Sequence, residues 1–309
     1  MNGLLVVNKP SGVTSRRVVD RAEQWFPGVK IGHAGTLDPL ATGVLVLCLG
    51  DAARLIEYVQ ELDKTYEAAL RLGAWSDTDD RDGAVQVVDD PAIPETRQIA
   101  EVLDSFAGAI EQTPPAYSAV RVDGSRAHEL ARRGRDVPLP ARRVRIDGVE
   151  LVHYAFPSLT LRIHCGKGTY IRALARSAGE RLGCGALVES LHRTRIGRFT
   201  STDAFPLSAD AQTVMQGVLP PRAAVDHLPA VSLPRDWLLR LSLGEWIPLR
   251  MATLISGNFG GSGANSELAV AVINERGELA AIALVTNEKA LRPRKVFKSA
   301  CPAQTGQSG

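Results

Sequence analysis

The stretch GHAGTLDPLATG, from Gly32 to Gly43, places a single carboxylate in a loop rich in glycine and threonine. This carboxylate belongs to Asp38, which stands before Pro39 and just ahead of the apolar run VLVLCLG. An Asp before a Pro commonly starts a turn, and that role alone would account for it. The glycines, however, let a ligand approach the backbone closely, and an isolated carboxylate between apolar flanks suits a nucleophile. Asp38 is therefore the first candidate catalytic residue.

The residue types in the polar loops exclude several simpler chemistries. The loop around Asp38 lacks the Gly-Lys-Ser/Thr that ends a phosphate-binding P-loop. The run DTDDRDG has Arg81 where a calcium loop needs its third ligand, and it lacks the closing Glu. We therefore interpret residues 76–84 as a hydrated acidic loop. The six histidines show neither HExxH nor paired spacing, so no metal site is predicted.

The composition is that of a soluble globular protein of about two domains, with 309 residues, 45% hydrophobic and 23% charged. No apolar stretch reaches the roughly 18 residues of a membrane span, and the first residues lack the pattern of a secretory signal. The four cysteines lie far apart without CxxC spacing, which predicts reduced thiols in a cytoplasmic protein.

Charge is distributed unevenly although the net charge is only +2. Residues 121–145 hold eight arginines against three acidic residues, whereas residues 76–90 hold six aspartates and one arginine. A solvated charged face explains either run. Guanidinium groups bind phosphate through two parallel hydrogen bonds, so the arginine-rich run also favours contact with RNA or DNA.

Hydrophobic periodicity predicts a large α+β domain that contains runs of antiparallel strands. Thr14 or Ser15 is expected to cap the first helix, Thr96 the third, and Gly183 or Gly185 is expected to close the fourth. A turn near Pro157 is expected to join two strands. The predicted strands are 3–10, 44–50, 64–76, 84–88, 144–156 and 158–170, and the predicted helices are 14–26, 51–60, 94–110 and 171–185.

A domain boundary is expected between about Leu228 and Arg240, where the pattern becomes rich in proline. Residues 267–285 then read as a β-hairpin turning at Arg276 and Gly277. These features predict residues 1–230 as one large domain, 231–300 as a small β-domain, and 301–309 as a disordered tail.

Five motifs in order make the chain recognisable: GLLVVNKPSGVTS, GHAGTLDPLATGVLVLCLG, KTYEAALRLG, QTPPAYSAV and HCGKGTYIRALARSAGERLGCGA. Together they closely resemble the pseudouridine synthases of the bacterial TruB family, from about Gly3 to Arg198. The C-terminal part resembles the small RNA-binding PUA domain of that family only loosely. The implied fold is α+β, with a mixed, mainly antiparallel sheet flanked by helices and a PUA-like β-domain.

The resemblance implies an enzyme that isomerises uridine 55 in the T-loop of tRNA to pseudouridine, flipping the target nucleotide out of its stack. All reacting atoms belong to the substrate, so no cofactor or metal is expected. The implied partner is the tRNA T-stem-loop, bound by a cytoplasmic monomer. Two alternatives are the guide-RNA-dependent branch of the same family and a tRNA-binding folding factor in which chemistry is secondary.

The resemblance also assigns roles to single residues. It implies that Asp38 is the essential catalytic Asp, that Arg172 keeps it anionic, and that Tyr66 stacks on the target base. His33 would hold the flipped-out conformation of the RNA loop. The remaining positions are Tyr170 and Leu191 at the base pocket, and Lys9 and Pro10 as supports of the Asp38 loop.

Residues 121–145 fall where the family has an insertion that clamps RNA. The implied RNA-binding residues are Arg121, Arg126, Arg132, Arg133, Arg142, Arg143 and Lys167.

Overall fold

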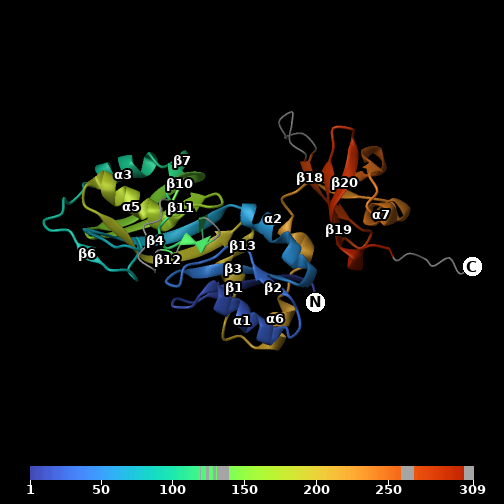
Figure 1. The fold of residues 1–309 in the computed structure, drawn as a ribbon, viewed down its shortest axis with the longest axis horizontal. Helices are drawn as coiled ribbons and strands as arrows, with labels where there is room; N and C mark the ends of the chain where they lie inside the picture. The colour runs from blue at the N-terminus through green and yellow to red at the C-terminus, as the bar shows by residue number, and fades with distance from the viewer. Residues whose placement is uncertain (119, 123–124, 128–129, 131–138, 259–267, 303–309) are drawn as a thin grey trace, which may run out of the picture.

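The computed structural model describes residues 1–118, 120–122, 125–127, 130, 139–258 and 268–302. These residues form a large sheet of ten strands and a small one of six, which Figure 1 shows apart from each other. Two further sheets have two strands each, β5 (Ala74–Trp75) with β6 (Gln86–Val87), and β8 (Arg121–Val122) with β9 (Ser125–Arg126). The large sheet takes up the N-terminal and central parts of the chain, and the small sheet the C-terminal part.

The large sheet is mixed but mainly antiparallel, as predicted, with parallel pairing only where β1 meets β14 and where β3 meets β12. Its order is β14-β1-β3-β12-β4-β11-β10-β7, with β2 beside β3 and β13 beside β12. Its strands are β1 (Gly3–Lys9), β2 (Ile31–His33), β3 (Thr42–Leu49), β4 (Lys64–Leu72), β7 (Gly108–Gln112), β10 (Arg142–Ala155), β11 (Ser158–Cys165), β12 (Ala186–Ile196), β13 (Phe199–Thr200) and β14 (Phe205–Pro206).

Helices cover the large sheet because each buries one apolar stripe against it. Helices α3 (Thr96–Asp104) and α5 (Ile171–Leu182) pack over the apolar faces of β4, β11 and β12. Helices α1 (Ser15–Trp25) and α6 (Ala211–Gln216) pack beside β1 and β3. The short α2 (Ile56–Glu61) follows a 3₁₀ turn, so the helix predicted over 51–60 forms only in its second half.

The small sheet has the order β16-β20-β19-β18-β15-β17. The hairpin predicted around Arg276 is the β18–β19 pair, and α7 (Arg235–Ser242) packs on the sheet. Its strands are β15 (Ala230–Ser232), β16 (Ile247–Pro248), β17 (Thr253–Ser256), β18 (Leu268–Ile273), β19 (Leu279–Val285) and β20 (Ala290–Val296).

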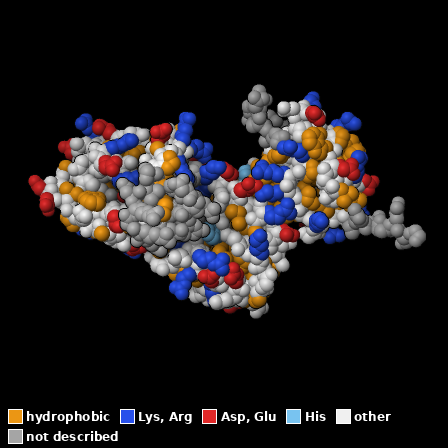
Figure 2. Space-filling model, in the orientation of Figure 1, with side chains coloured by type: hydrophobic (Ala, Val, Ile, Leu, Met, Phe, Trp, Pro, Cys, Tyr) orange, Lys and Arg blue, Asp and Glu red, His pale blue; other side chains and the backbone are white. Residues whose placement is uncertain are grey.

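The two sheets share a buried apolar cluster in which Val46 and Val59 pack with Ile282 and Phe297. At its edge Arg54 donates to the Val296 carbonyl at 2.7 Å and Lys295 pairs with Glu57. Basic side chains gather beside α2 in Figure 2, at this junction. The two sheets are therefore packed against each other rather than merely linked.

The helix predicted over 94–110 is too long. Glu95, not Thr96, caps α3, through a reciprocal capping box with Gln98. After Asp104 the chain turns, and residues 108–112 become the edge strand β7, where Ile110 pairs with Val144. By contrast Thr14 caps α1 as predicted, Gly183 closes α5 in the left-handed conformation, and β10 and β11 meet at Pro157.

Candidate active site

Asp38 lies in the loop that joins β2 to β3, and the first strand of the chain holds that loop from beneath. The ammonium group of Lys9, at the end of β1, is fully buried and donates to the carbonyls of Pro39 at 3.1 Å and Val13. The amide of Gly12 donates to the Pro39 carbonyl as well, at 2.8 Å. Burial lowers the pKa of Lys9 to about 8. Lys9 therefore contacts the Asp38 loop that it is predicted to support.

Arg172, in the first turn of α5, donates two hydrogen bonds from its guanidinium to the Asp38 carboxylate, one to each oxygen. Nε lies 2.9 Å from Oδ2, and Nη2 lies 3.0 Å from Oδ1. Arg172 is 4% exposed, and it also donates to the carbonyls of Thr78 and Tyr117. The Asp38 side chain keeps 32% of its surface exposed. A buried cation thus holds a carboxylate that still faces solvent, which is the arrangement a nucleophile or an electrostatic catalyst needs.

The acidic run at residues 76–84 is hydrated only in part: Asp77 and Asp82 are exposed, as its composition predicts, but two of its aspartates are not. Asp79 and Asp80 are buried, because each lies against an arginine of α5. Oδ2 of Asp80 is 3.5 Å from Nη1 of Arg172, and Asp79 pairs with Arg176. Burial raises the pKa of both carboxyl groups, that of Asp79 to about 6. Arg172 is therefore shared between an exposed carboxylate and a buried one.

Tyr66, on β4, is buried within the apolar cluster that contains Leu37, Leu40 and Leu191. Burial raises the pKa of its phenol, and the hydrogen bond to Arg193 opposes that rise. Leu37 and Leu40 flank Asp38 in the chain. The structure consequently places Tyr66 and Leu191 in the same apolar cluster as the two leucines of the loop that carries the carboxylate. Their roles at a base pocket stay predictions.

Two further predicted residues border this group. Tyr170 precedes α5, and the side-chain amide of Gln112 holds its backbone through both the N–H and the carbonyl, at 2.8 and 3.0 Å. Burial raises the pKa of its phenol. His33 ends β2, and burial lowers the pKa of its imidazole. Its Nδ1 is buried and has no hydrogen-bond partner among the described residues.

Comparison with known proteins matches residues 23–171 to the TruB family pseudouridylate synthases, N-terminal domain. A tRNA pseudouridine synthase B of Dehalococcoides mccartyi is 38% identical, covering 98% of each chain. The enzyme of the same name from Synechococcus is 37% identical, covering 96% of this chain and 98% of its own. The chain belongs to the TruB family. A solved H/ACA ribonucleoprotein structure, bound to a substrate RNA containing 2′-deoxyuridine, shares the fold of this TruB family member at a TM-score of 0.73. That match has 23% identity and covers 96% of this chain and 84% of the other.

Arg193 is a buried cation of this TruB family member that the sequence motifs did not single out. It is 2% exposed on β12, facing Tyr66 across one strand pair and Gly43 across the other. Nε donates to the Val44 carbonyl at 2.8 Å and Nη2 to the Gly35 carbonyl at 3.1 Å. Because Gly35 and Val44 lie on opposite sides of Asp38, Arg193 ties both arms of the loop together. The stretch LHRTRIG holds two arginines, Arg193 and Arg195, and nothing in the sequence distinguishes the buried Arg193 from the exposed Arg195.

The residues predicted to bind RNA differ in whether the structure describes them and in their exposure. Arg142 and Arg143 are exposed on β10, and Lys167 is exposed but pairs with Glu61 of α2 rather than with a residue of the Asp38 group. Pro10, also predicted as a support, is exposed, and its carbonyl accepts from Lys9. The other four predictions lie in the earlier part of the arginine-rich insertion, before β10. Arg132 and Arg133 fall outside the described residues, and so do the side chains of Arg121 in β8 (Arg121–Val122) and Arg126 in β9 (Ser125–Arg126).

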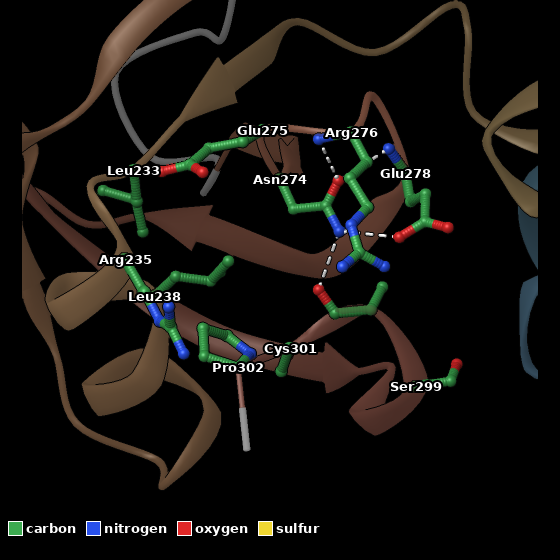
Figure 3. Close-up of a pocket in the computed structure, with 11 residues that line it drawn as sticks. Leu233, Arg235, Leu238, Asn274, Glu275, Arg276, Glu278, Ser299, Cys301 and Pro302 are labelled. Carbon is green, nitrogen blue, oxygen red and sulfur yellow. Dashed lines mark hydrogen bonds between the residues drawn. The ribbon is translucent and has the colours of Figure 1, made fainter. Parts of the chain in front are cut away.

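A hollow lies in the small sheet, remote in sequence from Asp38. This cavity of about 260 Å³ is bordered by the β18–β19 turn, the start of α7 and the last described residues (Figure 3). Asn274 organises its rim, accepting from the amides of Arg276 and Glu278 and donating to the Ala300 carbonyl at 2.9 Å. The side chain of Asn274 thus makes these hydrogen bonds to the protein's own backbone.

Within the described residues no helix is long and apolar enough to cross a membrane. In the same part of the chain, no three His, Cys, Asp or Glu side chains are grouped so that they could hold a metal ion. The expectation of a cofactor-free reaction stays a prediction.

Proposed function

We propose that this protein isomerises uridine 55 in the T-loop of tRNA to pseudouridine, with Asp38 as the essential catalytic residue. The observation that carries the proposal is the two-pronged contact of buried Arg172 with a carboxylate that remains 32% exposed. Membership of the TruB family supports the reaction, and the relatives' shared name, tRNA pseudouridine synthase B, supports the substrate.

The reaction exchanges one bond of the uridine for another. The bond between N1 and C1′ breaks, the uracil turns, and C5 bonds to C1′. The proton on C5 leaves and N1 ends with a proton, so no atom outside the substrate and water is consumed. Arg172 holds the Asp38 carboxylate oriented through its two hydrogen bonds, whichever atom the carboxylate meets.

The apolar cluster supplies the place for the uracil ring. Tyr66 offers a ring face on which a base stacks, a contact worth about 1–3 kcal/mol, and Leu191 packs in the same cluster. We assign to His33 the role of holding the flipped loop and to Tyr170 a place beside the base. Flipping costs a few kcal/mol of lost stacking, which these contacts offset.

The RNA is expected to lie over the exposed arginines of β10 and the arginine-rich insertion, where phosphates meet guanidinium groups. We propose residues 231–300, which contain nearly all of the small sheet, as a PUA-like RNA-binding domain. The enzyme would act as a cytoplasmic monomer, since its substrate is a free tRNA.

The test is release of tritium from an unmodified tRNA transcript carrying 5-tritiated uridine. The wild-type protein should release tritium, Asp38→Asn should not, and replacing the target uridine by cytidine should abolish release. Tight tRNA binding without release by the wild type would overturn the enzyme assignment and favour an RNA-folding factor. Release that persists after the cytidine replacement would overturn position 55.

A further inference from the structure

Ser15 is a buried hydroxyl at the start of α1 that helix formation does not require. The cap of this helix is Thr14, whose hydroxyl accepts from the Arg17 amide at 3.2 Å. Ser15 is 3% exposed, although serine in a first helical turn usually faces water or its own helix. A buried hydroxyl costs free energy unless it finds partners, and Ser15 finds both of its partners outside α1.

Both partners of Ser15 belong to one residue, Leu37. The Ser15 hydroxyl accepts from the Leu37 amide at 2.9 Å and lies 3.1 Å from the Leu37 carbonyl, to which it donates. Leu37 immediately precedes Asp38. On the far side of Asp38, the Pro39 carbonyl is held by Lys9 and the Gly12 amide. The backbone is thus pinned on both sides of the candidate nucleophile.

We propose that Ser15 is a positioning residue that aims the Asp38 carboxylate, a role that rests on the function proposed above. Arg172 fixes the carboxylate from the side-chain end, where its buried guanidinium is itself held by the carbonyls of Thr78 and Tyr117. The contacts of Ser15 with Leu37 fix the other end, the backbone from which the carboxylate projects. Catalytic geometry tolerates only a few tenths of an ångström, and a displacement of about 1 Å can cost a hundredfold in rate.

Removing the hydroxyl leaves the amide and carbonyl of Leu37 without this partner in a buried setting. The Leu37 side chain, 4% exposed in the cluster with Tyr66, would still anchor the loop, so the protein should fold. The loop would then sample positions in which Asp38 is misaligned. A specific consequence follows: the chemical step should slow while RNA affinity stays unchanged, because Ser15 itself is inaccessible to RNA.

The test compares Ser15→Ala with Thr14→Ala, a neighbouring loss of one hydroxyl that weakens the α1 cap without touching Leu37. Single-turnover tritium release, the Kd for unmodified tRNA and the melting temperature are measured for each. Ser15→Ala should slow the single-turnover step about 10- to 100-fold with Kd within about twofold of wild type. Thr14→Ala should lower the melting temperature while keeping the wild-type rate. Ser15→Thr keeps a hydroxyl and should restore most of the rate.

Ser15→Ala at the wild-type rate, or slowed no more than Thr14→Ala, would overturn the proposal. So would a defect that appears in Kd rather than in the single-turnover rate. If Ser15→Ala does not fold, Ser15→Cys keeps the shape and weakens the hydrogen bonds, and the same two outcomes decide. An inactive wild-type protein would instead overturn the proposed function, so the two failures are distinguishable.

Discussion

At the scale of single residues, the candidate site is a set of buried charges with one exposed member. Lys9, Arg172 and Arg193 are buried cations, Asp80 is a buried anion, and Asp38 alone is substantially exposed. Charges are stable in such an interior only when hydrogen bonds surround them, and the three cations donate to backbone carbonyls of the loops they hold. Catalytic orientation and charge burial are therefore achieved by the same contacts.

Asp80→Asn should impair the chemical step without weakening RNA binding. The amide keeps the size of the carboxyl group, but it removes the negative charge 3.5 Å from Nη1 of Arg172. Arg172 would then interact with Asp38 alone and hold it more tightly than the reaction requires. We expect a single-turnover rate at least about tenfold lower. Asp82→Asn, a change at an exposed carboxylate of the same run, should match the wild type; equal rates for both variants would contradict this role.

The raised pKa of Asp79, about 6 against an ordinary 3.8, predicts a pH-dependent stability. Between pH 4 and 6 the folded protein binds this proton more readily than the unfolded chain does. The free energy of unfolding therefore falls as the pH rises through that window, by on the order of 3 kcal/mol. Urea unfolding at pH 4 to 7 should show this fall in the wild type relative to Asp79→Asn. Parallel curves for the two proteins would refute the prediction.

At the scale of elements, the Asp38 loop depends on how closely two strands approach. Strand β3 runs beside β12 with Gly43 opposite Arg193, and a Cβ on Gly43 would lie 2.3 Å from the Arg193 carbonyl oxygen. The backbone at Gly43 also has φ of +100°, where side chains are strained. Glycine at this position lets β3 begin against β12, so the loop ahead of β3 sits directly beneath Arg193.

Gly43→Ala should therefore separate β3 from β12 and destabilise the protein by more than about 3 kcal/mol. Gly28→Ala is the matched control, because Gly28 has φ of +76° but no atom within 4 Å of the added Cβ. It should cost only the backbone strain, about 1 kcal/mol. The two melting temperatures measure the difference, and similar decreases would show that the close approach is unimportant.

At the scale of the whole molecule, opposite charges are separated along the chain although the net charge is only +2. On β10, Arg142 and Arg143 stand exposed, whereas Arg162 on β11 is matched by Glu67 and Glu150. Counterions condensed on the RNA are released when protein cations neutralise its phosphates, and a cation already matched by carboxylates adds less to that neutralisation. The arginines of one sheet thus differ in their expected contribution to RNA binding.

Replacing both Arg142 and Arg143 by Gln should weaken tRNA binding and flatten its dependence on salt. The slope of log Kd against log salt concentration should fall by about one for each phosphate that the protein no longer neutralises. Arg162→Gln should leave the slope unchanged. Filter-binding titrations between roughly 50 and 200 mM salt provide the measurement. An unchanged slope in the double variant would remove β10 from the RNA-binding surface.

The sequence by itself determined the local features: the Thr14 cap, the strand and helix periods, the hairpin at Arg276 and the isolated carboxylate of Asp38. Each of these features depends on residues within a few positions of one another, so their spacing in the sequence is enough to predict it. The resemblance to the family placed Arg172 beside that carboxylate in advance, but only the tertiary structure decided the rest of its surroundings. Arg172 reaches Asp38 across 134 positions and Arg193 reaches Gly35 across 158. Strand register and helix packing bring such residues together. The burial of Asp80 depends on the same packing, so composition alone wrongly predicts that it is hydrated.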